Sequence, residues 1–194
     1  GGVVGLVADL FEPEESLTLA VEAALGESLQ YVLVAGQEQA LEAIEHLRRG
    51  NAGRCGFVPV AALHETSPPA GETEPEGLLL QRVRVKPGFE AVARALLGNV
   101  VLVASIEEAV ARFNENGRVR TFVTPQGDLL SPRGFLIGGS REAAGGILAK
   151  KQEIRELERE IRALDESIAA HRRKLQELEA EVRRLDVDLQ RRIE

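Results

Sequence analysis

Hydrophobic residues in the first part of the chain alternate between short continuous runs and segments with helical spacing. The runs Val3–Phe11, Gln30–Ala35 and Cys55–Val60 are apolar and contain β-branched residues, which is typical of buried strands. Between them, Ser16–Leu25 and Gln37–Arg49 place apolar residues three and four positions apart. This spacing predicts two amphipathic helices between three strands.

The same order of elements is predicted again further along the chain. The sequence predicts strands at Leu78–Val85, Val100–Ala104 and Arg120–Thr124, with helices at Phe89–Leu97 and Ile106–Asn114. VLVAGQEQAL (32–41) aligns with VLVASIEEAV (101–110) at an offset of 69 residues. We therefore expect two related halves, each a strand-helix-strand-helix-strand unit. A turn at Pro125–Asp128 and a hairpin extension at Leu129–Leu130 follow the second half.

From residue 147 to the C-terminus, apolar residues recur every seven positions. Heptad positions a are Ile147, Ile154, Ile161, Ile168, Leu175, Val182 and Leu189, and positions d are Leu157, Leu164, His171, Leu178 and Leu185. This period predicts one coiled-coil helix of about 70 Å, at 1.5 Å per residue. We interpret His171 as a tolerated polar layer rather than as a ligand.

The predicted fold is a mixed α/β (α+β) domain of two pseudo-repeated subdomains, followed by a long C-terminal coiled-coil helix. Subdomain I spans residues 1–63 and subdomain II spans residues 78–146, and the coiled-coil arm spans residues 147–194. Residues 64–77 are acidic and rich in Pro and Gly, so we expect a mobile connector there. The absence of Met and the Gly-Gly start indicate a piece of a longer chain.

Charge and residue types narrow the classes of function. The net charge is −7, but residues 1–77 carry 3 basic and 13 acidic side chains, whereas residues 78–146 carry 9 and 6. Overall acidity argues against wrapping of nucleic acid and leaves room for a local basic face in the second half. Only 4% of the residues are aromatic, which disfavours base-stacking platforms.

No catalytic, cofactor or metal motif is found. The chain has no G-x-x-x-x-G-K-[ST] loop, no G-x-G-x-x-G between a strand and a helix, and no G-x-S-x-G elbow. A lone Cys55 excludes an internal disulfide and is typical of a reducing cytosol. His46, His64 and His171 are too scattered for metal-ligand spacing. We therefore predict no catalytic residue, no metal ligand and no cofactor.

Two clusters near the junction of domain and arm are open to functional interpretation. Gly134, Gly138 and Gly139 alternate with apolar residues, which fits either a loop with positive φ or a strand edge bared for another backbone. Basic side chains gather nearby and fit either ordinary helix solvation or phosphate contact. The basic residues are Arg133, Arg141, Lys150, Lys151 and Arg155.

Several motifs in order give a family resemblance. GVVGLVADLF, AALGESLQYVLV, AGRCGFVPV, LLGNVVLV and TPQGDLLSPRGFLIGGS resemble the hinge of a bacterial SMC (structural maintenance of chromosomes) protein. The resemblance covers residues 2–146 and continues into the returning coiled-coil arm. It implies a non-enzymatic homodimerisation hinge in a cytoplasmic, nucleoid-associated protein. The parent chain would carry an ATP-binding head and kleisin-type partners and serve chromosome condensation and segregation.

The resemblance also implies roles for the two clusters. Gly134, Gly138 and Gly139 match dimer-interface positions of a PGGxxTGG-like run, in which Arg133 here replaces one glycine and Ile137 the threonine. The basic cluster would make weak, sequence-independent DNA contacts, although Arg141-Glu142-Ala143-Ala144 stands where some relatives carry lysines.

The arm is expected to pair with a segment that precedes Gly1 in the parent chain, antiparallel to 147–194. Among the ten e and g positions from Glu158 to Asp188, seven are acidic and two are basic, which favours a basic partner. Two other classes of function stay open. One is a coiled-coil scaffold with a globular cap and no DNA role, and the other is an enzyme domain fused to a coil.

Overall fold

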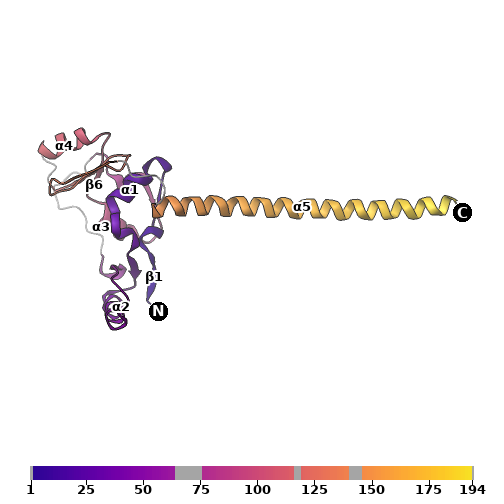
Figure 1. Cartoon of the computed structure of the whole chain (residues 1–194), viewed down its shortest axis with the longest axis horizontal. Coiled ribbons are helices and arrows are strands. Elements are labelled where there is room, and N and C mark those ends of the chain that lie inside the picture. The colour runs from indigo at the N-terminus through magenta and orange to yellow at the C-terminus, as the bar shows by residue number, and fades with distance from the viewer. Residues whose placement is uncertain (1, 64–75, 116–118, 140–145, 194) are drawn as a thin grey trace. The chain divides into compact units, whose positions relative to one another are not determined.

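The structure is a computed structural model that describes residues 2–63, 76–115, 119–139 and 146–193 (Figure 1). The chain divides into a globular unit, Gly1–Ala149, and a rod, Lys150–Glu194. The helices are α1 Thr18–Leu25, α2 Gln37–Gly50, α3 Glu90–Leu97, α4 Ile106–Glu115 and α5 Ile147–Ile193. The strands are β1 Val3–Leu6, β2 Phe11–Pro13, β3 Val32–Val34, β4 Phe57–Pro59, β5 Val83–Val85, β6 Val100–Leu102, β7 Thr121–Val123, β8 Leu129–Leu130 and β9 Leu136–Ile137.

The strands form two mixed sheets and a ribbon. The first sheet has the order β1-β3-β4, with β1 antiparallel to β3 and β4 parallel to it. The second sheet has the order β6-β7-β8-β9, in which β6 and β7 are parallel and the remaining pairs are antiparallel. The predicted mixed α/β class and the long C-terminal helix are confirmed.

The internal repeat is seen in the parallel strand pairs. Val32 lies opposite Phe57 in the first sheet, and Val101 lies opposite Phe122 in the second. The helix between the two strands begins at Gln37 in the first half and at Ile106, 69 residues later, in the second half. In the first half, the described residues contain no counterpart of β8 and β9. Among these described residues no strand pairs with the outer edge of β4, whereas β8 pairs with β7.

The prediction of one buried strand at Val3–Phe11 is wrong. A 3₁₀ turn at Val7–Asp9 separates β1 from β2, because the Asp9 carboxylate accepts the N–H of Leu6 at 3.0 Å. The two strands then join different sheets. The side chains of β1 are mostly exposed, including Val3 at 71%.

The prediction of a continuous strand at Leu78–Val85 is also wrong. Leu79–Arg82 forms a 3₁₀ turn, and only β5 is extended. The strand β5 pairs antiparallel with β2, with Val85 opposite Phe11. This ribbon joins the two halves of the sequence.

The hydrophobic core also joins the halves. Its main cluster includes Phe11, Val21 and Leu33 from the first half, and Val92 and Leu97 from the second. These side chains lose most of their contact with water on folding, which is the main favourable term in stability. The globular unit is therefore one cooperative body rather than two independent halves. Of the expected connector 64–77, residues 64–75 lie outside the described part.

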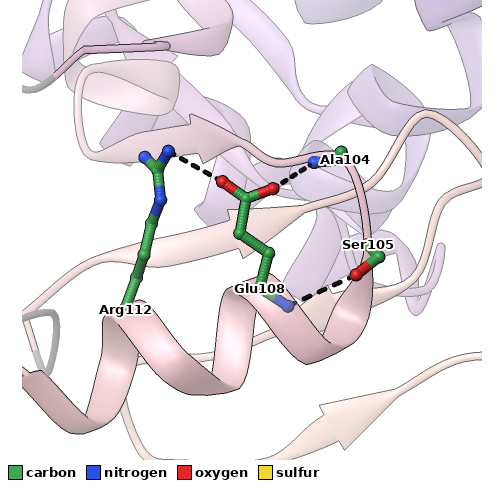
Figure 2. A network of polar contacts seen from close by, with 4 residues as sticks. All are labelled: Ala104, Ser105, Glu108 and Arg112. Atoms are coloured by element: carbon green, nitrogen blue, oxygen red, sulfur yellow. Dashed lines mark hydrogen bonds and ion pairs between the residues drawn. The ribbon is translucent and has the colours of Figure 1, made fainter.

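A polar network fixes the beginning of α4 (Figure 2). Ser105 Oγ accepts the N–H of Glu108 at 3.3 Å, and Glu108 Oε2 accepts the N–H of Ala104 at 2.9 Å. Arg112 pairs with the same carboxylate at 2.7 Å. The first bond satisfies the Glu108 N–H, one of the groups that a helix N-terminus leaves without an intrahelical acceptor, and the second ties the Glu108 side chain to the backbone just before the helix. They place α4 directly after β6, and the Ser105 hydroxyl also lowers the pKa of the Glu107 carboxyl.

Candidate functional site

The hairpin of β8 and β9 ends in an exposed apolar strand. Its turn is closed by the Ser131 N–H, which donates to the Phe135 carbonyl at 3.0 Å. The Gly134 N–H donates to the Ser131 carbonyl at 2.9 Å. Phe135, Leu136 and Ile137 are 62%, 59% and 62% exposed. Because adjacent strand residues point to opposite faces, β9 presents apolar side chains on both of its faces.

The backbone of β9 also has a free edge in the part of the chain that the structure describes, where β9 is the last strand of its sheet. Directly opposite residues in an antiparallel pair alternate between bonded and non-bonded pairs. Ser131 and Phe135 are bonded, so the next pair, Leu130 and Leu136, is non-bonded. The N–H and C=O of Leu136 therefore point away from β8. An unpaired donor and acceptor at an apolar strand edge is a template for another strand.

Each of the three predicted glycines has a reason within the chain. Gly134 lies at φ +80° and Gly139 at φ +124°, a region that favours glycine. A Cβ atom on Gly138 would meet the carboxylate of Asp128. The structure therefore accounts for the glycines through turn geometry and close contact. Their predicted role at a dimer interface stays a prediction.

Asp128, the last residue of the predicted turn, organises the end of β9. Its Oδ1 accepts the N–H of Gly139 at 3.2 Å. Its backbone N–H donates to Oγ1 of Thr124 at 3.1 Å, and its C=O accepts the Thr124 N–H at 2.9 Å. Thr124 is buried, so this turn is anchored in the fold. The Thr-Pro-Gln-Gly-Asp sequence was the available signal for this turn.

In the second half of the chain, the hairpin of β8 and β9 covers the apolar face of α4. Val110 and Phe113 of α4 pack against the cluster that contains Leu130 of β8. A Cβ atom on Gly134 would lie 3.6 Å from Phe113, so the hairpin turn lies against this ring. Helix α4 is thus covered on its apolar face by its own hairpin.

The matching positions in the first half are uncovered. At the 69-residue offset, Leu41 corresponds to Val110 and Ile44 to Phe113, yet Leu41 is 67% and Ile44 41% exposed. No residue of α2 is buried, although the helix was predicted to be amphipathic. We call the exposed face of α2, Leu41 and Ile44, together with the outer edge of β4, the open face.

The backbone of β4 matches the free edge of β9. The Val32 N–H donates to the Gly56 carbonyl at 2.9 Å, so in a parallel pair the N–H and C=O of Phe57 point away from β3. Pro59 has no N–H, so Phe57 is the centre of this edge. Phe57 also lines a groove of about 450 Å³, together with Val3 of β1 and Ala43 and Leu47 of α2 among others.

The predicted phosphate-binding residues lie in different parts of the chain. Arg133 is exposed in the hairpin turn of the globular unit, and Arg141 lies outside the described residues. Lys150, Lys151 and Arg155 lie in the first two turns of the rod, where Lys150 is exposed and the other two are half-buried. Their DNA contact stays a prediction.

Across residues 2–63, 76–115, 119–139 and 146–193, no three His, Cys, Asp or Glu side chains gather closely enough to hold a metal ion. No helix among the same residues combines the length and apolar character needed to cross a membrane.

The rod carries a continuous apolar stripe, as the heptads predict. The exposed a and d side chains are Ile154, Leu157, Ile161, Leu164, Ile168, Leu175, Leu178, Val182 and Leu185. Each is about half exposed along a single helix, which matches a surface built to pair with another helix. The imidazole Nδ1 of His171 lies 2.7 Å from the carbonyl of Ser167, so this d residue turns to its own helix.

The comparisons with known proteins agree with this fold. The family model of the SMC proteins Flexible Hinge Domain matches residues 1–112. The Chromosome partition protein Smc of Myxococcus xanthus is 37% identical over 173 residues, 85% of this chain and 14% of that protein. The protein of the same name in Bacillus subtilis is 25% identical over 177 residues, 87% of this chain and 15% of that protein. The chain therefore spans about a seventh of these relatives.

Solved structures give the same answer. An asymmetric dimer of the Geobacillus stearothermophilus SMC hinge domain matches with a TM-score of 0.73 and 25% identity, covering 87% of this chain and 70% of that chain. The Pyrococcus furiosus Smc hinge domain with an extended coiled coil matches with a TM-score of 0.62 and 26% identity, covering 97% and 69%. The chain belongs to the family of SMC hinge domains, which is a class of dimerisation module rather than of enzyme.

Proposed function

We propose that this chain joins two SMC protomers as a homodimer through the exposed edge of β9. The observation that carries the proposal is the combination of a free backbone edge at Leu136 with three exposed apolar side chains around it. Strand addition supplies main-chain hydrogen bonds, and apolar side chains supply the larger part of the affinity. Gly134, Gly138 and Gly139 hold this edge in shape for its partner.

The acceptor in this proposal is the open face of the partner chain. In the second half, β8 pairs with Phe122 while the hairpin covers Val110 and Phe113. In the first half, Phe57 and the exposed α2 residues offer the same kind of surface without a hairpin. The partner's β9 would supply what the first half lacks. Two copies related by a two-fold axis would make this contact twice.

Sedimentation of the whole chain tests this function. We expect a species of twice the 21.0 kDa of one chain at micromolar concentration. The apolar stripe of the rod could also self-associate, so the same measurement on the double variant Leu164→Glu, Leu178→Glu is the control. A dimer that persists there is formed by the globular unit. A monomer in that variant would contradict the proposal.

The wider role follows from the family. We propose that the parent protein acts in chromosome condensation and segregation in the cytoplasm, with an ATP-binding head and kleisin-type subunits. The hinge itself needs no cofactor in this scheme. A parent chain that lacks an ATPase head would contradict it.

We propose weak, sequence-independent DNA contact by Arg133, Arg141, Lys150, Lys151 and Arg155. The exposure of Lys150 supports it. Because few charges take part, affinity should fall steeply with salt, and Lys150→Glu should weaken binding about three- to tenfold. Lys174→Glu, in an exposed residue further along the rod, is the control. Equal loss in both variants, or binding that is indifferent to salt, would exclude this cluster.

We propose that the rod pairs with an antiparallel helix that precedes Gly1 in the parent chain. The exposed a and d stripe supports a helical partner, and the acidic e and g positions favour Lys and Arg in it. The parent sequence before Gly1 is the check. We expect heptads with basic e and g residues there, and an acidic or non-heptad segment would refute the pairing.

A further inference from the structure

Glu22 is a buried carboxylate that the proposed dimer contact does not use. It lies on α1 and is only 4% exposed. Its Oε1 accepts the N–H of Leu148 at 2.9 Å and the N–H of Ala149 at 3.3 Å. All three residues belong to the globular unit, although α5 continues into the rod. A side chain from the first half thus caps the first turn of α5 at Leu148, which lies 126 residues later in the sequence.

This contact is favourable for both partners. The first N–H groups of an α-helix have no intrahelical acceptor, and the helix dipole favours negative charge at this end. A buried carboxylate without hydrogen bonds would be costly, and the two N–H groups supply them. The side chain and the helix end therefore satisfy each other.

Two neighbours show that the site is shaped for this contact. A Cβ atom on Gly146 would collide with the carboxylate of Glu22, so only glycine leaves room for it. Leu148 is 2% exposed and belongs to the main core, and Ile147 packs against the same cluster. The first turn of α5 is therefore held by a polar cap and an apolar anchor at once.

We propose that Glu22 is the positioning residue of the arm: it fixes where the arm helix begins and ties the first turn of that helix to α1. A shift of α1 is then passed to the first turn of α5, which lies in the same globular unit. The contact lies within one chain, so the inference stands whether or not the proposed dimer forms.

Amide hydrogen exchange on the whole chain tests this role. In Glu22→Ala we expect the amides of Leu148 and Ala149 to exchange about tenfold faster, as after loss of a helix cap. Glu22→Gln keeps an acceptor oxygen without the charge, so its effect should be smaller. Glu27→Ala removes an exposed carboxylate just after α1 and should leave both amides unchanged.

Three outcomes would overturn the proposal. The first is exchange at Leu148 and Ala149 that stays within about twofold of the parent chain in a folded Glu22→Ala variant. The second is a rise shared equally by core amides such as those of Val21 and Val92, which would make Glu22 a general stabiliser. The third applies if Glu22→Ala fails to fold. Gly146→Ala displaces the same carboxylate, and unchanged exchange of the Leu148 and Ala149 amides in that variant would also overturn the proposal. Sedimentation of each variant shows separately whether the dimer persists.

Discussion

Leu136→Pro should turn the dimer into a folded monomer. Proline removes the one N–H of β9 that points away from β8, and edge strands tolerate proline where that group is unbonded. The bond would be lost in both contacts of a closed dimer, and each would leave a buried acceptor unpaired. We expect the dissociation constant, measured by sedimentation, to rise at least about 100-fold.

Leu136→Ala is the matched control, because it trims the side chain and keeps the N–H. It should weaken the dimer less than proline does. Thermal unfolding of both variants at low concentration reports whether the monomer fold is intact. Equal affinities of the proline and alanine variants would show that the outward N–H of β9 makes no bond to a partner.

Ile44→Glu should abolish dimerisation from the acceptor side. Ile44 is already 41% exposed, so a carboxylate there costs the monomer little. Under a partner's hairpin the same charge would be buried unpaired in both contacts, which costs several kcal/mol. We expect at least about a 1000-fold rise in the dissociation constant.

Arg49→Gln is the control for Ile44→Glu. It changes the net charge by the same amount on another face of α2, where Arg49 and Glu45 form an exposed pair. It should leave the dimer unchanged. If Ile44→Glu stayed dimeric as well, α2 would not be part of the acceptor.

The local pattern of apolar residues was sufficient to predict the helices. The spacing of Ala93 and Leu97 in α3, or of Ile106 and Ala109 in α4, places each apolar stripe against the core. The long helix followed equally well from its heptads. These features depend on residues within a turn or two of each other, and a single sequence contains that information.

Features that depend on distant partners were not predictable in the same way. The apolar run Val3–Phe11 gave no sign that the Asp9 carboxylate would accept the Leu6 N–H and divide it into two strands. Nothing local links Glu22 to Leu148. The glycines were correctly picked out as special, but the contact of Gly138 with Asp128 needed coordinates. The exposure of Ile44 was not predictable for the same reason, because helical spacing shows which residues share a helix face but not what covers that face.

Mixing a donor variant with an acceptor variant tests the account most directly. Leu136→Pro has a damaged β9 and an intact open face, and Ile44→Glu has the reverse. A dimer of either variant with itself has two damaged contacts. A mixed dimer has one intact contact, between β9 of Ile44→Glu and the open face of Leu136→Pro, and one damaged contact. We expect sedimentation of the mixture to show a dimer at concentrations where both separate samples are monomeric. A mixture that stays monomeric, with both variants folded and the parent chain dimeric, would contradict the proposed pairing of β9 with the open face.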